Sequence, residues 1–214
     1  MTREEKEQRL REIAAEVERC QKCILYRHAL RGVPGEGDPD AKIMFIGEAP
    51  GWHENQQGRP FVGPAGQFLE ELLRSVGLRR DQVYIANVIK HRPPDNRDPL
   101  PEEIAACNDY LDRQIEVIDP KVIVTLGRFS LAKFFPGERI GRVHGTARRH
   151  GQRLIFACYH PAAALHQSSL RRTIEEDFRR LPAVLAEAER LTAPPPPPEP
   201  VAPAAPAAKQ LSLF

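Results

Sequence analysis

Four short apolar runs constrain the fold of this chain more than any other feature. KIMFI, VYIANVI, KVIVTL and RLIFACY occupy residues 42–46, 83–89, 121–126 and 153–159. They are continuous rather than alternating with polar residues, which is typical of strands buried on both faces of a parallel sheet. Helical patterns lie between the runs. The sequence therefore predicts an α/β fold, a three-layer α/β/α sandwich around a short parallel sheet.

The helices can be placed by their end signals. Thr2 and Glu5 form a capping-box pattern at the start of the chain. Apolar spacing predicts a helix over residues 68–76, which Gly77 ends, and a second helix that Pro101 starts. A short helix is expected after residue 126. The last helical stretch, 170–190, should break or kink at Pro182.

Polar residues gather just beyond the carboxyl ends of the predicted strands. In parallel α/β sheets this edge is where ligands bind. The residues concerned are the Gly-Glu-Ala-Pro-Gly segment at 47–51, Asn87 with Lys90 and His91, Gly127 with Arg128, and His160 with Pro161. Their convergence on one edge is a stronger signal than any one of them alone.

Composition excludes some classes of protein. A length of 214 residues suffices for one domain of ordinary size, and a net charge of +2 gives no strong basic field. No segment approaches the roughly 18 apolar residues of a membrane span. The charged N-terminal segment has no signal-peptide core. We therefore expect a cytoplasmic protein, in which the four cysteines are thiols or metal ligands rather than disulfides.

Three cysteines suggest a metal centre. Cys20 and Cys23 form a Cys-x-x-Cys pair, and Cys107 lies in the helix that Pro101 starts. Two residues compete for the fourth ligand position. Cys158 lies inside an apolar run and is better explained as a core thiol, whereas His91 lies in a loop that can reach the Cys20 and Cys23 corner. Three cysteines and one histidine suit either zinc or an iron–sulfur cluster.

Several long motifs, in order and at compatible spacing, resemble the iron–sulfur uracil-DNA glycosylases of family 4. They are GEAPGWHENQQGRPFVGPAGQFL at 47–69, YIANVIKHRPPDNRDPLPEEIAAC at 84–107 and YHPAAAL at 159–165. The resemblance covers about 17–190 and implies a glycosylase domain over 1–190. It also implies hydrolysis of the N-glycosidic bond of uracil in DNA, which leaves an abasic site and initiates base excision repair.

The resemblance implies roles in recognising the base. The target nucleotide must leave the duplex to be read in a pocket. Phe61 matches the family residue that stacks on the uracil ring, and Asn87 matches the uracil reader, which accepts from N3–H and donates to O4. The backbone of Glu48, Ala49 and Pro50 should also touch uracil. Cytosine presents the opposite pattern to Asn87, and each unsatisfied buried group costs about 1–3 kcal/mol.

The resemblance also implies catalytic roles. His160 matches the histidine that donates a hydrogen bond to uracil O2, where negative charge develops. Glu48 would orient the attacking water and stabilise the positive sugar. Glu54 would lie near the C5 edge of uracil, where it helps to exclude thymine. Leu165 is a candidate plug for the vacated base stack. Phosphate contacts are expected among Lys90, Arg92, Arg128 and Arg142.

The chain departs from the family pattern at His91, where the family has a cysteine ligand. The resemblance therefore implies a [4Fe–4S] cluster held by Cys20, Cys23, His91 and Cys107. A second departure, at Trp52 and His53, affects the shape of the pocket mouth.

Two other functions compete with turnover. One branch of the superfamily binds uracil-DNA and captures it covalently, and it also carries a histidine at the cluster position. That branch has an inserted basic segment before the third cysteine-bearing helix, and the segment 93–107 of this chain has no such insert. A structural zinc protein that binds nucleic acid without catalysis is the third reading.

The C-terminal segment has two parts. Residues 193–208 hold eight of the 21 prolines and predict an extended linker, which we assign to 191–209. The last five residues, QLSLF, resemble the motif by which bacterial repair proteins bind the sliding clamp, with anchors at Gln210, Leu211, Leu213 and Phe214. We expect a monomer that binds uracil-containing DNA and the clamp.

Deleting residues 210–214 should abolish binding to the sliding clamp, because the linker alone offers no apolar anchor. Excision of uracil from short oligonucleotides should be unchanged, since the tether acts only through local concentration. Surface plasmon resonance with purified clamp measures the first effect. An unchanged clamp affinity in the deletion variant would contradict the assignment.

Overall fold

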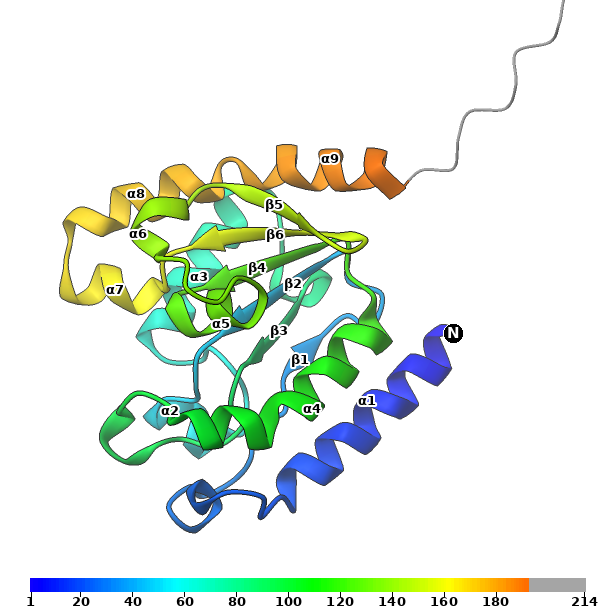
Figure 1. Ribbon diagram of the computed structural model, residues 1–214, viewed down its shortest axis with the longest axis vertical. Coiled ribbons are helices and arrows are strands. Elements are labelled where there is room, and N and C mark those ends of the chain that lie inside the picture. Colours follow the sequence, from blue (N-terminus) through cyan, green and yellow to red (C-terminus); the bar gives the residue numbers. More distant parts are fainter. Residues whose placement is uncertain (193–214) are drawn as a thin grey trace, which may run out of the picture.

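A computed structural model describes residues 1–192 and shows a mixed α/β fold built on one six-stranded sheet (Figure 1). The strand order is β1-β3-β2-β4-β6-β5. The strands are β1 (Glu36–Gly37), β2 (Ile43–Gly47), β3 (Tyr84–Asn87), β4 (Val122–Leu126), β5 (Ala147–His150) and β6 (Arg153–Cys158).

The four predicted strands form the parallel centre of the sheet. The strands β3, β2, β4 and β6 pair in parallel, with Phe45 opposite both Ile85 and Val124. Their residues are buried almost throughout, which confirms that the runs are covered on both faces. The chain leaves β2 toward β3 on one side and later returns to β4 on the other. A crevice for ligands is expected at such a switch point.

The two edge strands were not predicted, and both are antiparallel. The strand β1 has only two residues, too few for any periodicity, and β5 (ARRH) is polar and mostly exposed. Charged side chains on an edge strand discourage pairing with another chain. The sheet is therefore mixed rather than purely parallel, and its edges carry no apolar signal in the sequence.

The long helices agree with the sequence prediction, including the break near Pro182. The loop after β2 contains an additional helix, α2, that was not expected. The longer helices are α1 (Arg3–Glu18), α3 (Pro64–Ser75), α4 (Pro101–Ile118), α8 (Ser169–Phe178) and α9 (Leu181–Thr192). The shorter ones are α2 (Trp52–Gln57), α5 (Arg128–Phe134), α6 (Ile140–Val143) and α7 (Pro161–His166), with 3-10 turns η1 (Ile24–Arg27), η2 (Arg80–Gln82) and η3 (Pro94–Asn96).

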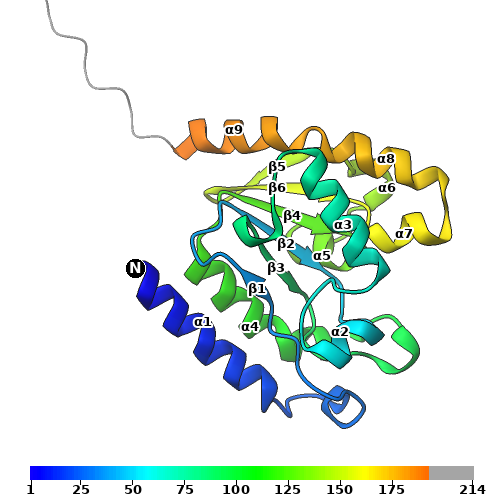
Figure 2. The same ribbon diagram turned by 180° about the vertical axis from the view of Figure 1, so that it is seen from behind.

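Helices cover both faces of the sheet (Figures 1 and 2). On one face, α3, α8 and α9 contribute apolar side chains such as Leu72 and Phe178 to a core with Phe45. On the other face, α4 contributes Leu111 and Ile118. The helix α1 packs on the outer side of α4, where Ile13 and Val17 meet Tyr110 and Val117. Cys158 is fully buried in the first core, which agrees with the core interpretation of that thiol.

The end of the described chain bears on the predicted domain boundaries. The helix α9 continues through Thr192, so the first two residues assigned to the linker, 191 and 192, are helical. The remaining linker and the clamp motif at 210–214 lie outside the described residues. Within residues 1–192, no helix is both long and apolar enough to cross a membrane.

Candidate active site

A cavity of about 680 Å³ lies beyond the carboxyl ends of the parallel strands. Every predicted base-recognition and catalytic residue except Leu165 lines it. The predicted residues in its wall are Glu48, Ala49, Pro50, Glu54, Phe61, Asn87 and His160, and they are joined by Asn96, Arg97, Asp98, Arg128 and His166, among others. The sheet edge therefore brings together segments that are more than 100 residues apart in the sequence.

The floor of the cavity is a tight contact among three residues. A Cβ atom on Gly47 would lie 2.4 Å from Oδ1 of Asn87 and 2.6 Å from Cζ of Phe61, so only glycine fits there. Asn87 is 2% exposed, and its Oδ1 has no hydrogen-bond partner within the described chain. An unpaired buried polar atom is rare because it costs free energy. This carboxamide is therefore open to a hydrogen bond from a ligand.

His160 precedes α7 and presents its ring to the cavity. Its Nδ1 accepts a hydrogen bond from the backbone N–H of Ala162, at 3.1 Å. Burial lowers the pKa of His160 to about 4, so the ring is neutral at physiological pH. Because Nδ1 is the acceptor, the single ring proton resides on Nε2. His160 is therefore a neutral hydrogen-bond donor. The sequence had left open whether this imidazole is neutral or charged.

Glu48 follows β2 and is half-buried in the cavity wall. Burial and the nearby charge of Asp98 raise its pKa to about 7, although Arg128 acts in the opposite direction. Arg128 and Asp98 form an ion pair at the rim. A carboxyl with a pKa near neutrality accepts protons more readily than an ordinary one, which suits a general base.

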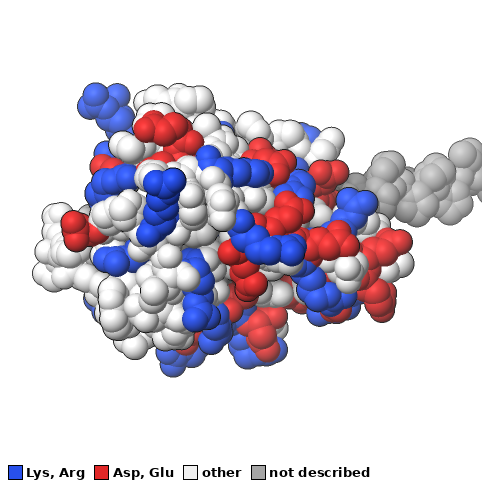
Figure 3. All heavy atoms as spheres, turned by 90° about the horizontal axis from the view of Figure 1, so that it is seen from below, with Lys and Arg blue, Asp and Glu red and all other residues white. Residues whose placement is uncertain are grey.

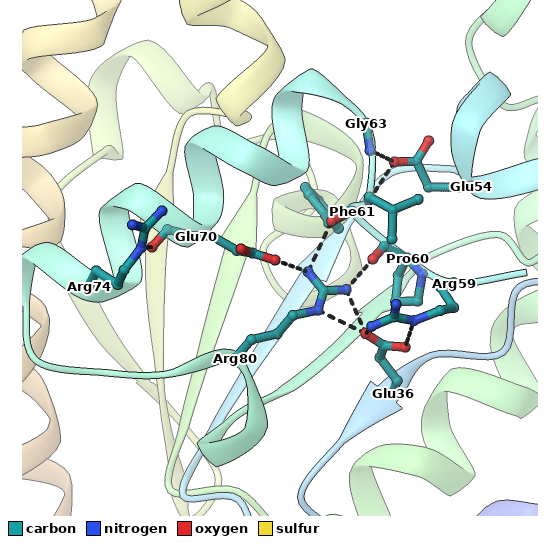
Figure 4. Close-up of polar contacts among 10 residues, drawn as sticks. Glu36, Glu54, Arg59, Pro60, Phe61, Gly63, Glu70, Arg74 and Arg80 are labelled. Atoms are coloured by element: carbon teal, nitrogen blue, oxygen red, sulfur yellow. Dashed lines mark hydrogen bonds and ion pairs between the residues drawn. The ribbon is translucent and has the colours of Figure 1, made fainter. Parts of the chain in front are cut away.

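The carboxylate of Glu54 accepts hydrogen bonds from three backbone amides of the surrounding loop. Its Oε1 accepts hydrogen bonds from the amides of Val62 and Gly63 at 2.8 and 2.9 Å, and its Oε2 accepts one from the amide of Gly51 at 3.1 Å. Figure 4 shows the carboxylate facing Gly63. Glu54 thus ties the loop after Phe61 to the start of α2, in addition to lining the cavity.

The predicted DNA contacts are only partly accessible. Leu165 lies on α7 and is 51% exposed, outside the cavity wall. Lys90 is fully buried and donates to the carbonyl oxygens of Pro34 and Asn87 and to Oε1 of Gln114, at 3.2, 3.0 and 2.7 Å. The expectation that Lys90 contacts phosphate is therefore wrong. A lysine that follows an apolar strand looks exposed in the sequence, and only the packing of α4 shows otherwise.

The predicted metal ligands gather beside α1 and α4. Cys20 and His91 line one small hollow. Burial raises the pKa of Cys107 to about 11, and Cys23 and Cys20 add to this shift because they lie nearby. His91 is 4% exposed, and its ring has no hydrogen bond to any residue between 1 and 192.

The donor types in this corner bear on which metal group it could hold. Among residues 1–192, no set of three or more His, Cys, Asp or Glu side chains is arranged to hold a single metal ion. A four-iron cluster is larger than an ion, and its ligands stand further apart. Three neighbouring thiols and an unpaired buried imidazole are the donor types that such a cluster uses.

Comparison with known proteins decides the family. The model of the family described as "Uracil DNA glycosylase superfamily" matches residues 34–181, well over half of the chain. The chain belongs to the uracil DNA glycosylase superfamily.

Three relatives within this superfamily are similar over most of their length. A type-4 uracil-DNA glycosylase of Sulfurisphaera tokodaii is 48% identical over 193 residues, which is 86% of this chain and 88% of that protein. The type-4 uracil-DNA glycosylase of Archaeoglobus fulgidus is 48% identical, over 80% and 91% of the two chains. That of Thermotoga maritima is 45% identical, over 84% and 94%.

Two residues at the cavity, Arg97 and its partner Glu103, were not predicted from the sequence. Arg97 lines the cavity and is anchored by Glu103, whose carboxylate it meets at 2.9 and 2.6 Å. Glu103 is 1% exposed and also accepts from the amide of Leu100. The start of α4 was a usable signal for Glu103, because acidic side chains are enriched in the first turn of a helix that begins with proline. No comparable signal pointed to Arg97.

Glu48→Gln should stabilise the folded protein at about pH 8. The folded pKa of Glu48 is raised, so the folded state keeps a proton that the unfolded state releases between the ordinary carboxyl pKa and about 7. Stability therefore falls as pH rises through that window. Because Glu48 is partly solvated, we expect a gain of about 1–2 kcal/mol, well below the unscreened shift. Urea titration measures it. The gain should be smaller at about pH 5, and an equal gain at both pH values would contradict this account.

His91→Ala should lower the iron content of anaerobically purified protein, whereas His91→Cys should preserve it, because a thiolate can replace the imidazole. Cys158→Ala is the control, since that buried thiol lies in the opposite core. Iron assay and absorbance near 400 nm provide the readout. An unchanged iron content in His91→Ala, or a loss in Cys158→Ala, would reassign the fourth ligand.

Proposed function

We propose that this protein is a monofunctional uracil-DNA glycosylase that hydrolyses the N-glycosidic bond of uracil in DNA. The observation that carries the proposal is the unpaired Oδ1 of buried Asn87 at the floor of the cavity, beside the ring of Phe61. Membership of the superfamily, and type-4 glycosylase relatives at 45–48% identity, support the same activity.

Recognition of the base rests on shape and hydrogen bonding. The Asn87 carboxamide accepts from N3–H and donates to O4 of uracil, which cytosine cannot match. Phe61 stacks on the flipped ring, and its own ring lies nearly parallel to that of His160, with centroids 5.4 Å apart. The two side chains that would contact the base are therefore neighbours. The backbone at Glu48, Ala49 and Pro50 forms the adjacent wall.

Cleavage of the C1′–N1 bond places negative charge on uracil O2 and positive charge on the sugar. The Nε2–H of neutral His160 donates to O2 and stabilises that charge without transferring a proton. Glu48 in its ionised form orients the water that attacks C1′ and stabilises the positive sugar. The water's proton passes to Glu48, for which a pKa near 7 is suited.

Several surface features support engagement of DNA. Leu165 is exposed on α7, and in this proposal it fills the stack that the flipped base leaves. Arg128 at the rim is 62% exposed and is a phosphate contact. In Figure 3 Lys and Arg are distributed over the whole face, and Asp and Glu lie among them, most densely in one half. Single cations such as Arg128, rather than a broad basic field, would therefore contact the DNA backbone, in keeping with a net charge of only +2.

Cys20, Cys23, His91 and Cys107 would hold a [4Fe–4S] cluster in this proposal. When bound, the cluster supplies a covalent cross-link between the segment after α1, the loop after β3 and α4, and no electron transfer is needed for hydrolysis. Asn87 lies four residues before His91. The ligand loop thereby also fixes the strand end that carries the uracil reader. A monomer whose C-terminal tail binds the sliding clamp completes the proposal.

Wild-type protein incubated with a uracil-containing oligonucleotide should yield alkali-labile abasic product. Asn87→Ala should lower the rate by about ten- to a hundred-fold, since the hydrogen bonds that select uracil are lost. Asn108→Ala is the matched control and should retain activity, because Asn108 does not line the cavity and accepts a hydrogen bond from Lys133. No product from wild type would defeat the proposal. An SDS-stable protein–DNA adduct without free uracil would indicate capture instead of turnover.

A further inference from the structure

Phe61 adopts a backbone conformation that needs support from its surroundings. Its φ of 51° lies in the left-handed region, which is unfavourable for a residue other than glycine. The residue is 5% exposed, and its ring forms part of the cavity wall. Its carbonyl lies directly against Gly66 of α3, so closely that a Cβ atom on Gly66 would be 1.9 Å from Phe61 O. The ring that receives the base is therefore oriented by a strained backbone.

Arg80 holds this backbone from outside the cavity. Its guanidinium donates from Nη1 to the carbonyl of Phe61 at 2.9 Å, and from Nη2 to the carbonyl of Pro60. Its Nε donates to Oε1 of Glu36 at 2.8 Å. Figure 4 shows the guanidinium between Glu36 on one side and the two carbonyls on the other. The Arg80 side chain is only 16% exposed, so these bonds are largely shielded from water.

The acidic partners keep the guanidinium in place. Arg59 also binds Glu36, at 2.7 and 2.9 Å, so the carboxylate is shared by two arginines. Burial alone would raise the pKa of Glu36, but the hydrogen bonds from Arg59 and Arg80 hold it below its usual value. Glu70 of α3 adds a second carboxylate 3.7 Å from Nη1 of Arg80. Arg59 reaches neither of the two carbonyls in the hydrogen bonds of the described chain.

A carboxylate holds the other side of the same loop. Glu54 binds the amides of Val62 and Gly63, which directly follow the residues whose carbonyls Arg80 binds. The four consecutive residues 60–63 are thus held by a cation through their carbonyls and by an anion through their amides (Figure 4). Both contacts are charge-assisted hydrogen bonds, the stronger kind.

We propose that Arg80 is a positioning residue for base recognition: by binding the carbonyls of Pro60 and Phe61, it sets the angle at which the Phe61 ring meets the flipped uracil. This inference rests on the proposed function. Arg80 does not touch the base itself, because it does not line the cavity. Its loss should allow the Phe61 backbone to relax, which would shift the stacked base relative to Asn87 and His160.

The test compares Arg80→Gln with Arg59→Gln. Both variants remove one arginine from Glu36 and leave the other, but only the first frees the carbonyls. Arg79→Gln is a second control, since Arg79 is 67% exposed and pairs with Asp81. Each variant is assayed for single-turnover excision of uracil, inhibition by free uracil, affinity for abasic-site DNA, and urea stability.

Arg80→Gln should lower the single-turnover rate by about ten-fold or more, as misplacement of a reacting group does. It should weaken inhibition by free uracil similarly, and leave affinity for abasic DNA unchanged, since that DNA carries no base for the cavity. Arg80→Lys should recover only part of the loss, because an ammonium cannot span both carbonyls and Glu36. This variant also carries the test if Arg80→Gln fails to fold.

Three results would overturn the inference in distinguishable ways. Equal rates and uracil inhibition in Arg80→Gln and Arg59→Gln would show that the carbonyl contacts do not matter. A parallel loss of abasic-DNA affinity would indicate a general structural role. Inactive wild-type protein would defeat the proposed function itself, together with the inference.

Discussion

The contact between Phe61 and Gly47 is the constraint on which the rest of the site depends. The missing side chain at Gly47 lets the end of β2 approach both the Phe61 ring and the Asn87 carboxamide. Bringing an aromatic ring and an amide to the same strand end requires an unusual backbone at Phe61, and that backbone requires hydrogen-bond partners on both sides. Glu54 and Arg80 are those partners. The shape of the cavity thus rests on charged groups, one of which lies outside it.

Buried ionisable side chains have a second structural use around β3. Lys90 is enclosed and bonded to acceptors from three different segments, including the carbonyl of Asn87. Glu103 is enclosed as well and is paired with Arg97. Burial lowers the pKa of Lys90 to about 7. A buried ionisable group is costly unless it is hydrogen-bonded, so each of these two side chains pins the segments around it to one arrangement. The hydrogen bond from Lys90 Nζ to the Asn87 carbonyl therefore holds the strand end that carries Asn87.

Much of the fold could be predicted from the sequence, because burial on two faces leaves a continuous apolar run. Residues 43–47, 84–87, 122–126 and 153–158 became strands close to the expected bounds. The edge strands could not be found in this way, since β1 is too short for a pattern and β5 is exposed and polar. The helix α2 was not predicted for a similar reason. Its six residues, WHENQQ, include only one buried residue and lie between glycines, so they show no apolar periodicity.

The site, like the fold, could be predicted only in part from the sequence. The sequence by itself determined which residue types stand after each strand, and therefore that Glu48, Asn87 and His160 converge at one sheet edge. It left their chemical states open, because a pKa depends on burial and on neighbours that are distant in the chain. Only the tertiary structure decided that His160 is neutral with its proton on Nε2, that Glu48 titrates near 7, and that Lys90 is buried. Arg79 and Arg80 are adjacent and of one type in the sequence, yet the fold turns the second toward Phe61 and the first toward solvent. That choice is set by where η2 meets the loop of residues 60–63, a contact between segments that no local pattern encodes.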